Sequence, residues 1–253
     1  PWVRFGVSPF GIWRNKRTDP KGSETSGLQN YDDLYADILL WARNGWIDYQ
    51  LPQLYWELEH KAASTLTLVN WWNDHAYERH MYIGQDVDRT MKSAAVDGSS
   101  DSSQLNHKVR LSRELPNVHG NCWWPGYSVT ANVGGVADSL SSRLQSTPAL
   151  VPSYPWISSA QPDAVSDLHT SGVTLTWRSP EPKASPDDIV KWIIYRFDTP
   201  DGIDIEQAAS IAAIVSTPEY TPTTSGYYVV TALSRVNNES APSSPVYIHI
   251  TNL

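Results

Sequence analysis

The sequence predicts an α/β domain of about four β/α units followed by a small all-β sandwich. Before residue 150, short apolar runs alternate four times with helical patterns, which is typical of β/α architecture. Past residue 163 the runs become short, β-branched and aromatic, with turn residues between them. The stretch "TPALVPSYPWISSAQP" between these regions carries four prolines in sixteen positions. We therefore expect domains at residues 1–152 and 164–253, joined by a Pro-rich linker at 153–163.

The first unit pairs the run "VRFGVSPFGIW" with a helix over "NYDDLYADILLWARNG". Asn30 is a suitable N-cap, and Gly45 is a suitable stop. Leu34, Ile38 and Trp41 recur at helical spacing and should share one buried face. This pattern predicts one continuous helix.

Three further units follow in the same order. The second strand is "IDYQLPQLYWE", and the third and fourth are "HMYIGQDV" and "VHGNCWW". Helices are expected over "KAASTLTLVNWWNDH", near 103–114 after a Ser/Asp-rich loop at 97–103, and near 136–145. The strands should thus end near Trp13, Glu57, Asp86 and Trp124.

The all-β region is expected to form strands at "VTLTW", "KWIIYRF", "GYYVVTAL" and "VYIHI". It resembles a fibronectin type III domain through Trp177, "IIYR", the spacing Tyr228-x-Val230-x-Ala232 and "NNESAPSSP". Tyr228 matches the tyrosine corner, whose hydroxyl bonds back to the chain. Such modules are spacers or docking surfaces, so no chemistry is assigned to this one.

Composition excludes some functions. The net charge of −8 and 18% charged residues leave no basic patch for nucleic acid. No apolar run of about 18 residues is present for a membrane span. The single cysteine, Cys122, excludes an internal disulfide framework, and the histidines do not gather at metal-ligand spacing. We expect neither a metal site nor a cofactor.

Twelve tryptophans and thirteen tyrosines stand against three phenylalanines, and nine of the tryptophans precede residue 125. Core filling explains most of them. The rest are candidates for a groove that stacks on the CH groups of sugars.

In parallel β/α folds the ligand-facing residues lie at the carboxyl ends of the strands. Glu57 is the candidate general acid, because apolar neighbours such as Tyr55 and Trp56 raise the pKa of a carboxyl. Two structural alternatives stay open for Glu57: an ion pair with a base such as Arg14, and a carboxylate at a helix N-terminus. Asp86 is a weaker candidate acid. The candidate substrate-binding residues are Trp13, Arg14, Gln53, Tyr55, Trp56, His60, Gln85, Asp86 and Trp124. Asp48, at the opposite end of its strand, is read as structural.

Dense motifs over residues 1 to about 152 resemble the glycosyl hydrolase-like 10 family. They are "FGVSPFGIWRN", "YDDLYADILLWARNGWIDYQLPQLYWE", "LVNWW", "MYIGQ", "LPNVHG" and "TPALVP". The resemblance implies a (β/α)8 TIM barrel related to glycoside hydrolases that acts on, or binds, bacterial glycan such as peptidoglycan strands. It also implies export to the periplasm or the cell surface, with a lipid anchor on the parent protein as one route. The glutamate of the family's "PQLYWE" motif falls on Glu57.

The chain departs from this family in two respects. Only four strands precede the linker, so the resemblance implies a partial barrel, the C-terminal half, without the family's earlier acidic strand-end motif. The strand end "GNCWWPG" also differs from the family's more usual serine-containing, aromatic-rich one. A glycosidase ordinarily needs two carboxyls. The missing barrel half is therefore expected in the same parent chain, or in a second chain if two halves dimerise. A glycan-binding or scaffold protein without catalysis remains the alternative.

Overall fold

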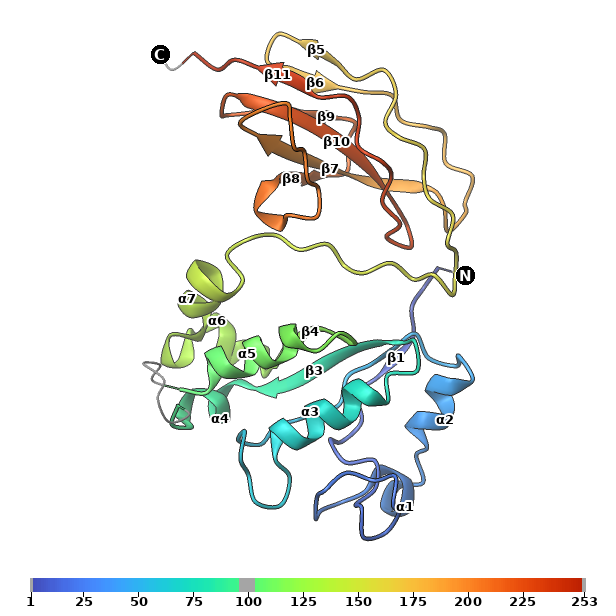
Figure 1. Cartoon of the computed structure of the whole chain (residues 1–253), viewed down its shortest axis with the longest axis vertical. Coiled ribbons are helices and arrows are strands. Elements are labelled where there is room, and N and C mark those ends of the chain that lie inside the picture. Colours follow the sequence, from blue (N-terminus) through green and yellow to red (C-terminus); the bar gives the residue numbers. More distant parts are fainter. Residues whose placement is uncertain (1, 96–102, 252–253) are drawn as a thin grey trace. The chain divides into compact units, whose positions relative to one another are not determined.

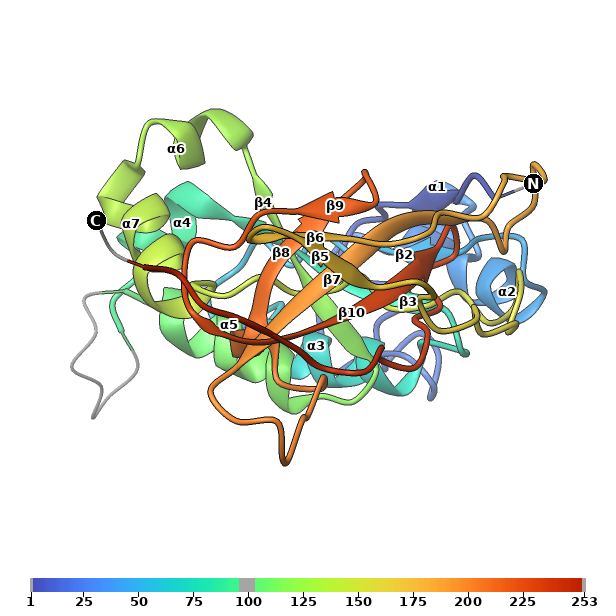
Figure 2. The same ribbon diagram turned by 90° about the horizontal axis from the view of Figure 1, so that it is seen from above.

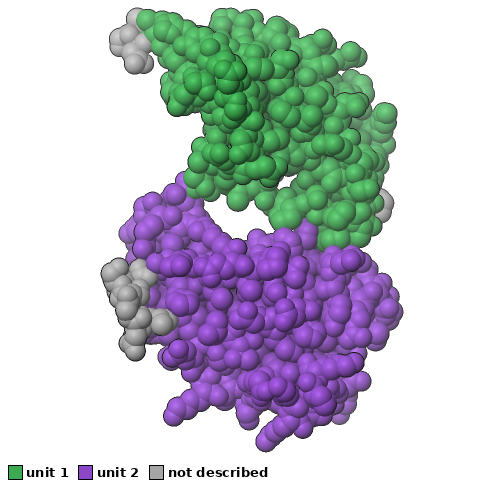
Figure 3. Space-filling model, viewed as in Figure 1, with its two compact units in different colours: residues 1–3, 147–253 green, residues 4–146 purple. Residues whose placement is uncertain are grey.

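The computed structural model describes residues 2–95 and 103–251. The chain divides into two compact units, one of Arg4–Ser146 and one of Pro1–Val3 with Thr147–Leu253 (Figure 3). Each unit has its own hydrophobic core, and each is described by itself.

The first unit alternates strands and helices (Figure 1). Its elements are β1 (Gly6–Val7), α1 (Asn30–Leu34), α2 (Ile38–Arg43), β2 (Tyr49–Gln50), α3 (Thr65–Asp74), β3 (His80–Asp86), α4 (Val87–Lys92), α5 (Leu105–Glu114), β4 (Val118–Trp124), α6 (Gly126–Thr130), the 3-10 turn η1 (Val133–Gly135), α7 (Val136–Ser139) and the π-helical turn η2 (Leu140–Leu144).

The four strands form one parallel sheet in the order β1-β2-β3-β4. Met81 and Ile83 of β3 are fully buried in a core that includes Trp72 of α3. Side chains alternate along a strand, so Tyr82 lies on the face opposite these residues. Its ring is 6.0 Å from that of Tyr49 on the neighbouring strand. Parallel strands flanked by helices confirm the predicted α/β class of this unit.

The third and fourth strands agree with prediction. β3 ends at Asp86, and β4 ends at Trp124. The first two strands end at Val7 and Gln50, so the ends predicted near Trp13 and Glu57 are wrong. Pro9 and Pro52 interrupt the ladder because proline has no N–H to donate. Their carbonyls still accept bonds from the next strand, so the pairing resumes as isolated bridges of Gln53 to Phe10 and Gly84.

The single helix expected over 30–45 is wrong, because the chain breaks at residues 35–37. Tyr35 adopts the left-handed conformation, with φ 55° and ψ 33°, and ends α1. Asp37 then caps α2 by accepting a bond from the Leu40 N–H at 3.1 Å. Asn30 does not cap α1, since its amide donates to the carbonyls of Phe10 and Ile12. Leu34 is 44% exposed rather than buried, because the break turns it away from the face of α2.

The remaining helices differ from prediction in their bounds. α3 begins at Thr65, after Ser64 accepts a bond from the Thr67 N–H at 3.2 Å, so the residues from Lys61 onward form a loop first. α5 lies where a helix was expected, although the predicted loop at 97–103 falls almost wholly outside the described residues. The last predicted helix is split into α7 and η2.

The second unit is made of two antiparallel sheets (Figure 2). Its elements are β5 (His169–Ser171), β6 (Thr174–Thr176), β7 (Ile189–Phe197), the 3-10 turn η3 (Ala208–Ser210), β8 (Ile211–Val215), β9 (Glu219–Tyr220), β10 (Gly226–Ser234) and β11 (Val246–Ile248). One sheet has the order β5-β6-β9, and the other has the order β11-β10-β7-β8.

A shared core holds the two sheets together. Leu175 of β6 packs with Trp192, Ile194 and Val230 of the four-stranded sheet. The predicted bond of Tyr228 is confirmed: its buried hydroxyl donates to the Thr224 carbonyl at 2.6 Å.

The Pro-rich stretch expected to be a linker is bonded to the second unit. The Tyr154 N–H donates to the Val236 carbonyl at 3.0 Å. The Asn238 amide donates to the carbonyls of Ser158 and Ala160, both at 2.9 Å. A Pro-rich segment forms few hydrogen bonds within itself, because proline has no N–H to donate. The turn at residues 236–238 supplies several of the missing partners.

Across residues 2–95 and 103–251, no helix has both the length and the apolar character that a membrane crossing requires.

Candidate functional site

Three strand ends come together at one edge of the parallel sheet. Asp86, the last residue of β3, is in register with Trp124, the last residue of β4. The segment that follows β2 joins the same edge, because Gln53 bridges to Gly84. Asp86, Trp124 and the segment that follows β2 are therefore neighbours at this edge.

Tyr55 and Trp124 form a stacked aromatic pair at this edge. Their ring centroids lie 5.4 Å apart, with an interplanar angle of 13°. Trp124 is 52% exposed, so much of its indole is open to solvent. Partial burial raises the pKa of the Tyr55 hydroxyl, and charges on Cys122 and Asp86 raise it further. The tyrosine therefore stays protonated and able to donate a hydrogen bond at neutral pH.

The Glu57 side chain is exposed, rather than enclosed by the apolar groups expected around it. Its Oε1 accepts a bond from the Ser93 hydroxyl of the α4 C-cap at 3.3 Å. Arg14 bonds other carboxylates instead of Glu57, and the helix that follows is capped by Ser64. Glu57 is thus a solvent-accessible carboxylate in the loop between β2 and α3.

Asp86, the second candidate acid, is only 7% exposed. Its Oδ1 caps α4 by accepting a bond from the Arg89 N–H at 2.9 Å. The Arg89 guanidinium lies 3.6 Å from its other oxygen. These bonds occupy part of the capacity of the Asp86 carboxylate to act on a ligand.

The two candidate glutamines and His60 bond within the protein. Gln53 donates to the Ser8 carbonyl at 3.1 Å. Gln85 is 1% exposed and donates to Asn121 at 3.1 Å, so it lies beneath the sheet edge. The exposed His60 accepts a bond from the Ala63 N–H through Nδ1 at 3.2 Å, and its Nε2 remains outside this bond.

Trp13 and Arg14 lie away from the stacked pair. Trp13 is 5% exposed, and its ring stacks on that of Trp71 at 5.9 Å. Arg14 bonds Asp32 through two nitrogens and Asp19 through a third, and the Asp32 carboxylate raises the pKa of the guanidinium. Both residues order the loop after β1, and this burial and pairing do not favour the ligand contacts predicted for them.

Trp56 is half-buried against the core, and its carbonyl is held by two donors. The Thr65 hydroxyl and the Lys108 ammonium both lie 2.8 Å from that oxygen. Sequence reasoning missed Lys108. The helical spacing of the sequence could have shown it, because Lys108 shares one face of the helix with Leu105, Val109 and Ser112, and all four are buried.

Asp48 has the structural role assigned to it. Its carboxylate accepts a bond from the Phe5 N–H at 2.7 Å, at the amino end of β2. Among the described residues, no three His, Cys, Asp or Glu side chains are grouped as metal ligands.

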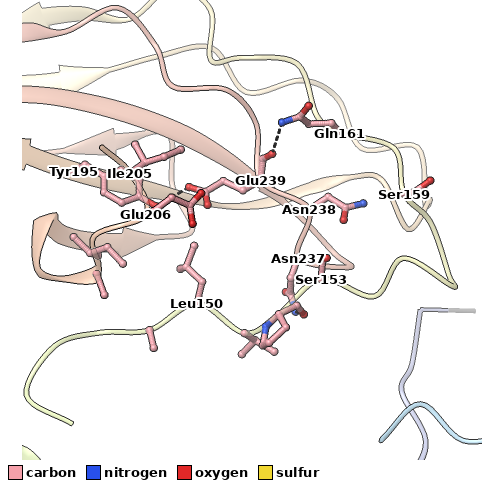
Figure 4. Close-up of a pocket in the computed structure, with 15 residues that line it drawn as sticks. Leu150, Ser153, Ser159, Gln161, Tyr195, Ile205, Glu206, Asn237, Asn238 and Glu239 are labelled. Atoms are coloured by element: carbon pink, nitrogen blue, oxygen red, sulfur yellow. Dashed lines mark hydrogen bonds between the residues drawn. The ribbon is translucent and has the colours of Figure 1, made fainter. Parts of the chain in front are cut away.

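A separate cavity of about 550 Å³ lies in the second unit (Figure 4). Leu150 and Gln161 line it from the Pro-rich stretch, and Tyr195 and Glu239 line it from the sandwich. Glu239 accepts bonds from the hydroxyls of Tyr195 at 2.7 Å and Thr231 at 2.5 Å. None of the sequence-predicted site residues belongs to this cavity.

Comparison with known proteins concerns mainly the first unit. Residues 1–99 match the family model described as Glycosyl hydrolase-like 10. Glycosyl hydrolase YngK of Bacillus subtilis (strain 168) is 41% identical over 165 residues, which is 64% of this chain and 32% of the relative. Glycosyl hydrolase DigH of Escherichia coli K12 is 45% identical over 126 residues, which is 47% of this chain and 29% of the relative. The DigH of Escherichia coli O6:H1 is 35% identical over the same length.

The chain therefore spans about a third of the length of these curated relatives. The similarity to glycosyl hydrolases covers residues 1–99 in the family match.

Proposed function

We propose that this chain is part of a bacterial glycoside hydrolase. Glu57 would act as an acid/base or electrostatic residue, and Tyr55, Trp56 and Trp124 would shape sugar subsites. The observation that carries the proposal is the stacked pair of Tyr55 and the half-exposed Trp124 at the strand ends, with the exposed Glu57 two residues beyond Tyr55. Flat apolar sugar faces pack on such rings, and glycosidic bonds are cleaved by carboxyl groups.

The proposed substrate is a bacterial glycan, with peptidoglycan glycan strands as the first candidate. The parent protein would be exported to the periplasm or the cell surface. Similarity to proteins named glycosyl hydrolases supports the reaction class. The glycan itself is a proposal that rests on the motifs of residues 1–152.

We also propose that further β/α units complete the sheet into a (β/α)8 barrel, supplied by the same parent chain or by a second chain. β1 and β4 each have a single strand neighbour among the described residues. An apolar hollow of about 350 Å³ beside β1 is lined by Phe10, Leu34 and Trp41. Open edges and exposed apolar side chains favour a covering neighbour. The added units would bring the second carboxylate.

For residues 164–253 we propose a fibronectin type III-like module that acts as a spacer or docking surface. The proposal is supported by the three- and four-stranded sheets and by the hydrogen bond of Tyr228.

Hydrolysis of purified peptidoglycan glycan strands by the full-length protein tests the proposal. Glu57→Gln removes the ionisable group and keeps the size of the side chain, so we expect at least a hundredfold fall in kcat. Glu59→Gln is the matched control, because Glu59 is also exposed and lies two residues away. Unchanged turnover in Glu57→Gln would remove Glu57 from the mechanism.

One observation favours glycan binding without catalysis as a second candidate. Asp86, the other candidate carboxyl, is buried, caps α4 and pairs with Arg89. Binding of glycan strands by a full-length protein that releases no reducing ends would support this candidate and contradict hydrolysis.

A further inference from the structure

Lys108 of α5 is a buried cation bonded to the main chain of the candidate site. It is 2% exposed, and its Nζ donates to the Trp56 carbonyl at 2.8 Å and to the Thr90 hydroxyl at 3.1 Å. Lysines are almost never fully buried without a partner, since an ammonium loses its hydration there. Neutral acceptors compensate for only part of that loss. A negative charge nearby is therefore needed to stabilise the buried ammonium of Lys108.

Two carboxylates supply that charge. Burial lowers the pKa of Lys108 to about 8, while Asp86 and then Glu57 act in the opposite direction and favour the ammonium. Asp86 comes from the end of β3, and Glu57 follows β2. The other charged group in this arrangement is Arg89 of α4, which pairs with Asp86 at 3.6 Å and is mostly exposed. Lys108 is thus a buried positive charge whose ammonium form both candidate acids favour.

Lys108 also holds the backbone that carries Glu57. Its ammonium donates to the carbonyl of Trp56, the residue before Glu57. Gln104 accepts a bond at 2.9 Å from the N–H of Leu58, the residue after Glu57. Gln104 and Lys108 lie one helical turn apart, so they project from the same side of α5. The main chain is therefore fixed by α5 on both sides of Glu57, while the Glu57 side chain stays open to solvent.

We propose that Lys108 is a positioning residue for Glu57: its bond to the Trp56 carbonyl fixes the main chain from which the Glu57 side chain projects. The inference rests on the proposed glycosidase function and adds a residue that would place its candidate carboxyl. Cleavage depends on a carboxyl held at the scissile bond, so a fixed main chain at Glu57 contributes to the rate.

The first test needs no substrate. Coupling between two charges is reciprocal, so removal of the charge on Glu57 must destabilise the Lys108 ammonium. In the full-length protein with ¹³C-labelled lysine, NMR titration should show a lower midpoint for Lys108 in Glu57→Gln than in the wild type. The control Glu59→Gln should leave it unchanged. Both glutamates are exposed, so both variants should fold. Equal Lys108 midpoints in all three proteins would overturn the proposal.

The second test measures the consequence for catalysis on purified peptidoglycan glycan strands. Lys108→Met keeps the length of the side chain and removes the charge, so we expect at least a tenfold fall in kcat with KM within twofold. Lys108→Arg, which keeps a charged donor for the Trp56 carbonyl, should recover most of the lost kcat. An unchanged kcat in a folded Lys108→Met protein would contradict the positioning role.

The two tests separate the possible failures. Wild-type protein that cleaves no glycan, together with a Lys108 midpoint that responds to Glu57→Gln, would refute hydrolysis while the electrostatic coupling stands. Active wild type with no such response would refute the role of Lys108 alone.

Discussion

Tyr55 stacks on Trp124 with ring centroids 5.4 Å apart and planes inclined by 13°, and the two residues come from different strand ends of one parallel sheet. The stack holds the Trp124 indole in one orientation while leaving it 52% exposed. A rigid, solvent-facing ring of this kind is suited to pack against the apolar face of a sugar.

Replacement of Trp124 should therefore weaken glycan binding. We expect Trp124→Ala to lower the affinity of the full-length protein for peptidoglycan glycan strands roughly five- to tenfold, or about 1 kcal/mol, because one aromatic contact is lost. Isothermal titration calorimetry would measure the change. Trp46→Ala is the matched control, since Trp46 is 61% exposed but precedes β2 instead of following it. A similar loss of affinity in both variants would argue against a subsite at Trp124.

The charge on Lys108 should make the stability of the first unit depend on pH. The pKa of Lys108 is about 8 in the folded protein and 10.5 in the free side chain. Between these values the unfolded chain binds more protons, so the free energy of unfolding rises with pH. Below about pH 8 Lys108 is protonated in both the folded and the unfolded chain. Its burial then lowers the free energy of unfolding by a constant amount, on the order of 3 kcal/mol.

Urea unfolding at pH 7.5 and pH 10 would measure this effect. Over that interval the wild type should gain about 2 to 3 kcal/mol relative to Lys108→Met, which has no ammonium to release. Lys61→Met, at an exposed lysine, serves as the control. A relative gain of the same size against Lys61→Met would show that Lys108 is not its source.

The hydroxyl of Tyr228 should contribute measurably to the stability of the second unit. It is buried and donates to the Thr224 carbonyl at 2.6 Å. Tyr228→Phe leaves that carbonyl without this donor, so the free energy of unfolding should fall by about 1 to 2 kcal/mol. Tyr247→Phe is the control, because Tyr247 is 53% exposed on the neighbouring strand. If chemical denaturation gave equal midpoints for the two variants, the bond would carry no net stability.

The Asn238 amide should protect the Pro-rich stretch from proteolysis. Its two bonds to the carbonyls of Ser158 and Ala160 attach that stretch to the sandwich. We expect Asn238→Ala to raise the rate of limited proteolysis within residues 150–162 several-fold, because local opening becomes easier. Gln207→Ala, at an exposed amide that bonds Asp204 within its own loop, should leave the rate unchanged. Cleavage of Asn238→Ala at the wild-type rate would mean that other contacts hold the segment.

Much of the fold could be predicted from local patterns. β3 and β4 end where predicted, because Asp86 caps the next helix and Pro125 has no N–H for the ladder. The helix over 30–45 could not be predicted correctly, since its apolar spacing is regular. The competing bonds of Asn30 to carbonyls in a distant loop become visible only in three dimensions.

For the candidate site, residue patterns alone placed Asp86 and Trp124 at strand ends, because the direction of a parallel strand sets the edge that its last residue occupies. Only the tertiary structure decided what surrounds the other candidates. It buries Trp13 against Trp71 and leaves Glu57 in solvent. It also places the Lys108 ammonium on the Trp56 carbonyl, next to Glu57 in the chain, from a helix some fifty positions further along. Burial and charge depend on neighbours that are distant in sequence, and these two properties set the protonation state on which the proposed chemistry depends.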